Sequence, residues 1–482
     1  MRATENSPLA PVNNSQRPRR AALAAPSLIV SALLLAFTGL SPRVDAAPAP
    51  SGSSPAATPA RADEAPTIRF GGTMATLAHL RNDTDFDRSL RVDDRDGQTD
   101  GQIASYFLPK LQVDAAGGVS FVYELELGWN SWSRNDAGQP NQFFPGRREG
   151  LQLRHRQLWG GYGSGPWTLR VGYQRLNDPS GLFLDQQAGL AQLRWRGAGG
   201  QRVRVELGQL AESSYEGIAV NDNNFTTDSF VGGVQLRQPL SGEKLRLESS
   251  LHGLRDDRSI GRPLQLFSGT IGLRVKREGL KAWAHLVLQR GRWEGAGLGN
   301  LDEEIQSWAL QLGASGRQGK LLWSVNSLTL SADNNSDGDG LWGAFWGSGK
   351  NRSRSVFLTE DERRDRYDNL DERVGSFWGP FLVNRAGLTV NELSLGYRGE
   401  RYIPRLVVSH GAALNPANAL GEQSLGWELS LLQRFPLSDH AALSLDGLIF
   451  LPGGAAAAFV NDIDRGALEP IYGAAVGFLV DF

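Results

Sequence analysis

The chain has 482 residues, of which 40% are hydrophobic and 21% are charged, and it contains no cysteine. The lack of cysteine excludes disulfides, thiolate metal sites, cysteine nucleophiles and the acylated anchor of a lipoprotein. A formal net charge of −2 gives no indication of a nucleic-acid partner, and we expect none.

Residues 1–46 have the layout of a secretory signal peptide. Basic residues ending at Arg20 precede an apolar run, and Val44 and Ala46 follow it at the positions expected before a cleavage site. An uncleaved anchor helix is the alternative, but Pro26 within the run favours cleavage. Residues 47–65 are rich in Ala, Pro and Ser, which predicts a flexible periplasmic leader.

Residues 66–482 are expected to form one outer-membrane β-barrel. No apolar run in this part of the chain reaches the length of a membrane-spanning helix. Segments of about ten residues instead alternate in polarity, and in one of them charged residues separate Val203, Val205 and Leu207. The expected strands lie near residues 67–81, 100–113, 119–130, 152–162, 167–175, 188–196, 202–211, 226–238, 243–254, 264–276, 280–292, 304–315, 320–331, 388–398, 403–411, 423–435, 440–450 and 471–482. They predict an all-β, antiparallel transmembrane barrel of about 18 strands, closed by the C-terminal strand.

The links between these strands fall into two sets. Links such as Ala115–Gly118 and Gly163–Pro166 are short, whereas Ser131–Leu151 and Ala332–Gly387 are long and polar. Short periplasmic turns and long external loops are typical of bacterial outer-membrane barrels, which contact outer-membrane lipid. A soluble β-sandwich would alternate in polarity too, but it has no reason to sort its links by length.

The end of the chain gives a further signal. Gly477, Val480 and Phe482 resemble the C-terminal ending that the outer-membrane assembly machinery reads, so we expect that machinery to be a partner.

Many basic residues share the parity expected to face the lumen. Such fixed charges in a restricted pore favour anions. The alternative is that arginines and glutamates only brace the barrel wall, with Glu124, Glu126, Glu206, Glu248 and Glu392 among the acids. The inward bases on this register are Arg170, Arg194, Arg196, Arg202, Arg204, Arg237, Lys244, Arg246, Arg274, Lys276 and Lys281.

The stretch from Leu169 to Arg196, LRVGYQRLNDPSGLFLDQQAGLAQLRWR, resembles the alginate export family of outer-membrane proteins. The shared elements are Gly-x-Gln-Arg, a turn, and Gly-Leu-x-x-Asp. In this chain they correspond to Gly172, Gln174, Arg175, Gly181, Leu182 and Asp185.

The resemblance implies a barrel that passes an acidic exopolysaccharide outward, in contact with periplasmic polysaccharide export components. Arg175 and Asp185 would form a constriction pair, with Arg154 or Arg156 beside them. Taken together with the inward bases, the candidate lumen residues are Arg154, Arg156, Arg170, Gln174, Arg175, Asp185, Arg194, Arg204, Arg246 and Arg274.

The long external loop, residues 332–387, contains half of a calcium-binding pattern. Asp333, Asn335 and Asp337 have the spacing of the first ligands, but Ala344 stands where the closing glutamate belongs. A plain polar loop is the alternative, and apart from this calcium no cofactor is expected. Thr359 and Glu362 have the spacing of a helix capping box, so a short helix here would either cover the pore or lie in solvent.

Neither a Gly-x-Ser-x-Gly nor an H-E-x-x-H pattern occurs, so we do not expect an enzyme. The main hypothesis is an exopolysaccharide secretion porin. The alternatives are an uptake porin for small anions or oligosaccharides, and a surface-binding barrel that displays its long loop.

Overall fold

In the computed structural model the chain divides into two units, Met1–Pro59 and Ala60–Phe482, and the structure describes residues of the second. The predicted signal peptide and nearly all of the predicted leader lie outside the described residues. The described ranges are 65–81, 100–129, 152–210, 229–241, 244–257, 263–294, 302–333, 341–347, 386–419, 421–457 and 469–482.

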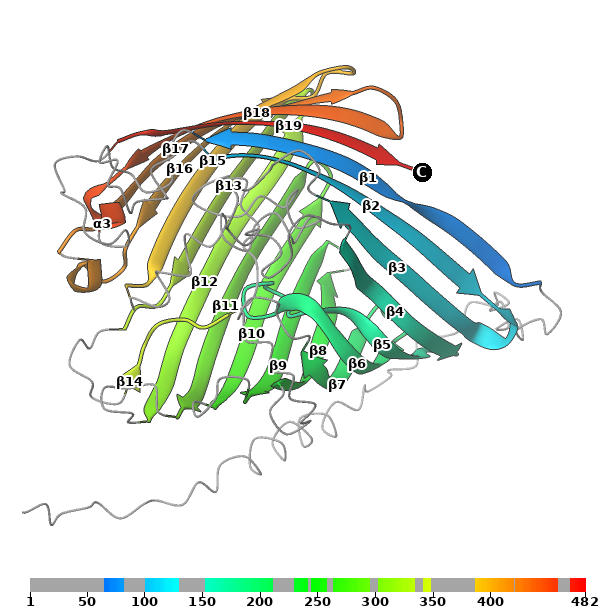
Figure 1. Cartoon of the computed structure of the whole chain (residues 1–482). Helices are drawn as coiled ribbons and strands as arrows, with labels where there is room; N and C mark the ends of the chain where they lie inside the picture. The colour runs from blue at the N-terminus through cyan, green and yellow to red at the C-terminus, as the bar shows by residue number, and fades with distance from the viewer. Residues whose placement is uncertain are drawn as a thin grey trace, which may run out of the picture. The chain divides into compact units, whose positions relative to one another are not determined.

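Antiparallel strands close into a barrel (Figure 1). Within the described residues the sheet has 19 strands, of which 18 form the closed barrel. These are β1 Thr67–Arg81, β2 Asp100–Asp114, β3 Val119–Trp129, β4 Gln152–Ser164, β5 Trp167–Asn177, β6 Asp185–Arg196, β7 Arg202–Leu210, β8 Ser229–Ser241, β9 Leu245–Asp256, β10 Leu264–Arg277, β11 Leu280–Trp293, β12 Glu303–Gln318, β13 Leu321–Leu330, β15 Leu388–Tyr397, β16 Ile403–Ala412, β17 Ser424–Pro436, β18 Ala441–Pro452 and β19 Ile471–Asp481. The remaining strand, β14 (Leu341–Trp342), pairs in parallel with β12.

The helices of the described residues are short: η1 Ala116–Gly118, η5 Pro416–Ala419 and α3 Gly454–Ala457. None of these described helices has the length and apolar character needed to cross a membrane.

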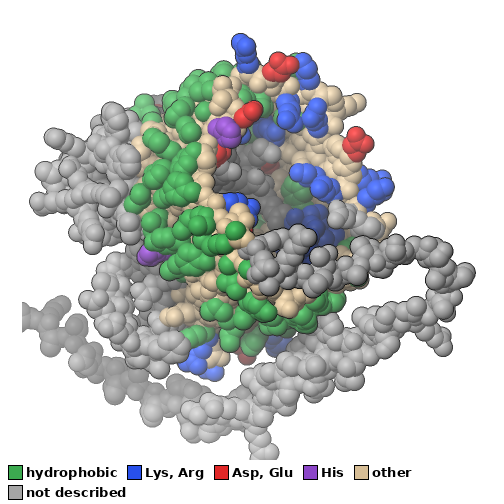
Figure 2. Space-filling view, turned by 90° about the vertical axis from the view of Figure 1, so that its right-hand side faces the viewer, with side chains coloured by type: hydrophobic (Ala, Val, Ile, Leu, Met, Phe, Trp, Pro, Cys, Tyr) green, Lys and Arg blue, Asp and Glu red, His purple; other side chains and the backbone are tan. Residues whose placement is uncertain are grey.

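The two faces of the wall differ in polarity, as the alternation predicts. On the outer face large apolar side chains are left uncovered, with Val171 54%, Leu207 67% and Phe267 60% exposed. The intervening positions on the inner face are polar and buried, for example Gln192 and Glu206. An apolar outer belt is unfavourable in water and favourable in lipid, so this face contacts the membrane. Figure 2 shows hydrophobic side chains over the outer surface and Lys and Arg side chains gathered around a hollow.

The links between strands differ in length between the two ends of the barrel, as predicted. At one end, here called the turn end, successive strands are joined by tight turns such as those at Gly279 and Gly319, whose φ angles of 70° and 58° suit glycine. At the other end, the loop end, the links are longer. In bacterial barrels the turn end is periplasmic. The predicted fold, an all-β antiparallel barrel closed by the C-terminal strand, is confirmed.

The barrel closes where β19 pairs with β1. Beyond β19, Phe482 and Gly72 exchange two backbone hydrogen bonds. The N–H of each residue donates to the carbonyl of the other, at a distance of 3.0 Å in both cases. The ring of Phe482 stacks on Phe107, with centroids 5.5 Å apart. Gly477 and Val480, the other residues of the expected assembly signal, pair with Leu77 and Met74.

Candidate functional site in the barrel lumen

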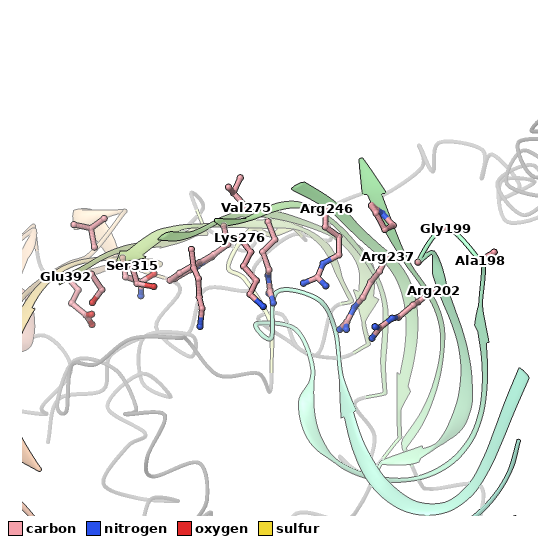
Figure 3. A pocket seen from close by; sticks show the side chains of 17 residues that line it. Ala198, Gly199, Arg202, Arg237, Arg246, Val275, Lys276, Ser315 and Glu392 are labelled. Carbon is pink, nitrogen blue, oxygen red and sulfur yellow. The ribbon is translucent and has the colours of Figure 1, made fainter. Parts of the chain in front are cut away.

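Two cavities, of ≈ 800 Å³ and ≈ 840 Å³, lie along the inner wall toward the turn end of the barrel. They share the lining residues Ala198, Arg202 and Arg237. In Figure 3 Arg202, Arg237, Arg246 and Lys276 extend from successive strands. The basic lining residues of the two cavities are Arg170, Arg194, Arg196, Arg202, Arg204, Arg237, Arg246, Arg274, Lys276 and Lys281, and Glu392 is the acidic one.

Several of these bases stand directly opposite one another on paired strands. Arg194 pairs with Arg204, and Arg246 pairs with Arg274. Like charges in directly opposite positions destabilise a sheet. The surface that these bases present to the cavities is positive, which suits anions.

Buried glutamates lie behind the bases. Glu206 and Glu248 face inward from β7 and β9, yet the arginines around them leave both almost fully covered. The Nε atom of Arg204 lies 2.9 Å from Oε2 of Glu206. The Nε atom of Arg246 lies 3.1 Å from Oε1 of Glu248, and Nη2 of Arg274 lies 3.2 Å from Oε2. The glutamates thus hold the arginines in place while the cavity surface stays basic.

Arg170 and Arg156 have other partners. Arg170 lies over the ring of Trp159, with its Cζ 4.2 Å from the ring centroid, which is a cation–π contact. Arg156 is mostly buried in the wall, where its Nη1 donates to Glu126 over 2.9 Å. Arg154 pairs with Glu126 through the β3–β4 register, and its side chain lies outside the described residues.

Arg175 and Asp185 form the pair that the family resemblance implies, but not in the lumen. Nε of Arg175 donates to Oδ1 of Asp185 over 2.6 Å, and Nη2 donates to Oδ2 over 2.7 Å. Arg175 has the parity of the lipid-facing residue Val171, and its side chain is 53% exposed. The location in a constriction is therefore corrected: the pair lies on the outer face, near the loop end.

Gln174 does face inward, but it is buried. Its Nε2 donates to the carbonyl of Leu190 over 3.3 Å, and it lines neither cavity. A few residues further on, the chain enters a segment that also lies on the inner side of the wall.

That segment, residues 178–184, links β5 to β6 and folds against the inner wall. All of its residues are buried, and Leu182, Phe183 and Leu184 join a cluster of inward-facing apolar residues. Thr270 of β10 donates to Oδ2 of Asp178 over 3.3 Å, which joins the segment to the wall. We call residues 178–184 the inner segment. The alternation of the strands does not predict this segment, although its apolar residues in a link between two strands are a signal.

A second stretch, residues 341–347, also lies inside the barrel. Gln289 of β11 donates to the carbonyl of Trp346 over 2.6 Å and accepts from its N–H over 3.0 Å. The ring of Trp346 lies 6.0 Å from that of Phe183 in the inner segment. Both stretches lie in the lumen on the loop-end side of the basic cavities.

The calcium prediction stays a prediction. Asp333 is buried, its carboxylate accepts from the N–H of Gly343 over 3.3 Å, and its carbonyl accepts from Asn415 and Asn418. Asn335 and Asp337 lie outside the described residues, as does the expected helix after Thr359. Among the residues that the structure describes, no group of three or more His, Cys, Asp or Glu side chains has the arrangement of a metal site.

Comparisons with known proteins agree with the fold. No protein-family model and no curated protein matches this sequence. Among solved structures, OccK9 (OpdG) of Pseudomonas aeruginosa is 13% identical, with 86% of this chain and 98% of that chain covered and a TM-score of 0.52. OccAB1 of Acinetobacter baumannii is 7% identical over 86% and 96% of the two chains, with a TM-score of 0.53. OpdK of P. aeruginosa, crystallised with vanillate, is 12% identical over 86% and 98%, with a TM-score of 0.50.

At sequence identities this low, the structural likeness establishes the fold alone. The chain has the closed 18-stranded architecture of outer-membrane porins, and the protein is an outer-membrane β-barrel. These likenesses lend no support to alginate export or to exopolysaccharide secretion.

Proposed function

We propose that the protein is an uptake porin for small organic anions, carboxylates in particular. The observation that carries this proposal is the basic lining shared by two adjoining cavities on β5 to β11. Guanidinium groups bind carboxylates through two parallel hydrogen bonds, so each arginine offers an anion a site. A row of weak sites lets an anion advance without being trapped.

The same lining would suit an acidic polymer, which was the main hypothesis from the sequence. Two observations favour a small solute. The inner segment and residues 341–347 lie within the barrel and reduce the room for a polymer chain. OpdK, one of the similar structures, was crystallised with vanillate, a small aromatic carboxylate. Display of the long loop as a binding surface concerns residues that are mostly outside the described part, and nothing in the lumen favours it.

The first test is ion selectivity in planar lipid bilayers. Full-length mature protein would be inserted, and the reversal potential measured in a potassium chloride gradient, followed by flux of benzoate and of neutral benzyl alcohol into vesicles. We expect anion selectivity and faster flux of benzoate than of benzyl alcohol. Replacing Arg194 and Arg237 together by Gln should lower the anion-to-cation permeability ratio by roughly twofold to fivefold, because two of the fixed charges that focus the potential are lost.

Arg175→Gln is the matched control, because this arginine faces outward. It should leave the permeability ratio unchanged. A cation-selective wild-type channel, or equal effects of the inner and outer arginine substitutions, would contradict the proposal. Loss of cell-surface polysaccharide in a deletion strain, with unchanged growth on aromatic carboxylates, would favour secretion.

A further inference from the structure

Two rows of residues behind the basic lining have the same construction. In the first row Glu206, Gly233 and His252 stand opposite one another on β7, β8 and β9. The imidazole reaches across the glycine, and its Nε2 lies 2.9 Å from Oε1 of the glutamate. Gln192 and Gln235 donate to the same carboxylate over 3.0 Å and 3.2 Å.

The second row is displaced by two strands. Glu248, Gly272 and His285 stand opposite one another on β9, β10 and β11. Nε2 of His285 lies 3.3 Å from Oε2 of Glu248. One further position corresponds: an arginine stands two residues before each glutamate, Arg204 in the first row and Arg246 in the second.

Glycine is required at the centre of each row. A Cβ atom on Gly233 would lie 2.1 Å from Cδ2 of His252, and a Cβ atom on Gly272 would lie 2.1 Å from Cδ2 of His285. Real Cβ atoms do not come this close to other atoms, so any other residue would displace the ring. The glycine provides the space through which the imidazole contacts a glutamate two strands away.

The contacts with the glutamates show which ring nitrogen of each histidine donates a hydrogen bond. An ionised carboxylate only accepts hydrogen bonds, so Nε2 carries the proton in both contacts. The imidazole thereby supplies a hydrogen-bond donor to the buried carboxylate. Both histidines are buried, and neither lines either of the two basic cavities, so they do not meet an anion held there.

From this geometry we propose that His252 and His285 are positioning residues for the anion pathway, each acting through its glutamate on the arginines of the lining. This inference rests on the proposed function. A buried carboxylate accepts hydrogen bonds from the donors within reach, because an unpaired charge inside the wall costs free energy. The imidazole occupies one carboxylate oxygen from behind. In the first row the imidazole contacts Oε1 while Arg204 contacts Oε2, so the histidine fixes the carboxylate in the position from which it holds the arginine.

The test compares His252→Leu, His252→Gln and Glu206→Gln in the full-length mature protein in planar bilayers. The readouts are the reversal potential and the concentration of benzoate that blocks half of the current. We expect His252→Leu to lower the permeability ratio and to raise the blocking concentration about threefold to fivefold, which is within the range of one ordinary net hydrogen bond because the histidine acts on the arginine indirectly. His252→Gln, which keeps a donor on a chain of similar reach, should restore much of both.

The decisive arm is the double variant. If the histidine acts through Glu206, His252→Leu has no further effect on selectivity once Glu206→Gln is present. Equal effects of His252→Leu in both backgrounds, or an unchanged permeability ratio in correctly folded His252→Leu, would overturn the proposal. The same variants of His285 and Glu248 repeat the test in the second row. They decide whether the histidine acts through its glutamate if the His252 variant does not fold.

His410→Leu is the control, since this histidine lies on β16, away from the basic cavities, against Trp427. It should change neither readout. Folding is checked by the mobility of unheated protein on a gel. If the wild-type channel shows no anion preference, the proposed function fails and this inference fails with it. If the wild type prefers anions and the histidine variants match it, only this inference is overturned.

Discussion

At the scale of single residues, Asp178 shows how one carboxylate holds a loop inside the barrel. Its Oδ1 accepts from the N–H groups of Phe183 and Leu184 over 3.1 Å and 2.9 Å. Its Oδ2 accepts from the N–H and the hydroxyl of Ser180 and from the hydroxyl of Thr270. These donors are buried, so without the carboxylate each would lack a partner away from water.

We therefore predict that Asp178→Ala releases the inner segment from the wall. Each orphaned donor costs about 1–3 kcal/mol, and five donors lose their acceptor together. The expected result is a larger single-channel conductance and faster hydrogen exchange of residues 178–184. Asp178→Asn keeps one acceptor oxygen and should have a smaller effect. Unchanged conductance in Asp178→Ala would show that packing alone holds the segment.

At the scale of elements, the closing strand β19 depends on contacts at its very end. Tyr472, Val476 and Phe478 lie on the outer face with Phe482, and the terminal residue contacts two rings across the seam. These are Phe107, with stacked rings, and Phe70, with centroids 6.0 Å away.

Phe482→Ala should therefore impair closure more than Phe478→Ala, a lipid-facing aromatic on the same strand. Aromatic pairs contribute about 0.5–1.5 kcal/mol beyond the area they bury, and the terminal ring makes two such contacts. The measurement is the fraction of protein that refolds into lipid vesicles and its midpoint of unfolding in urea. Equal losses in the two variants would show that the seam gains nothing specific from Phe482.

At the scale of the whole molecule, the barrel has lipid on one side of a single-layer wall and polar surroundings on the other. Neighbouring residues of a strand therefore belong to different environments. On β5, Val171 is exposed on the outer face, whereas Thr168 lines a cavity.

A charge introduced on the two faces should consequently have opposite outcomes. Val171→Arg is expected to destabilise the barrel by about 2–4 kcal/mol, as a cation near the middle of the lipid belt does. Thr168→Arg should cost less, about 0.2–1 kcal/mol for the like charge of Arg194 directly opposite, and should increase anion selectivity. Urea unfolding in vesicles and the reversal potential measure the two effects. A similar loss of stability in both variants would contradict the assignment of the faces.

The sequence alone determined the strands, their parity and the closure of the barrel, because alternation, link length and the C-terminal pattern are local properties of the chain. It also indicated the inward bases, since parity follows from the same alternation. Arg175 has the same parity as Leu169 and Val171, which the structure places on the outer face, whereas the resemblance to a constriction motif implies the lumen. Parity was the better guide here because it follows from backbone geometry.

Only the tertiary structure decided what lies inside the barrel. The inner segment reaches the wall of β10, and the two histidines meet glutamates on strands that are not their neighbours. Such contacts depend on the pairing register of several strands and on a glycine in the strand between, none of which leaves a signal within one segment. The distribution of the bases could be read along the chain, but the arrangement that holds them required the closed sheet.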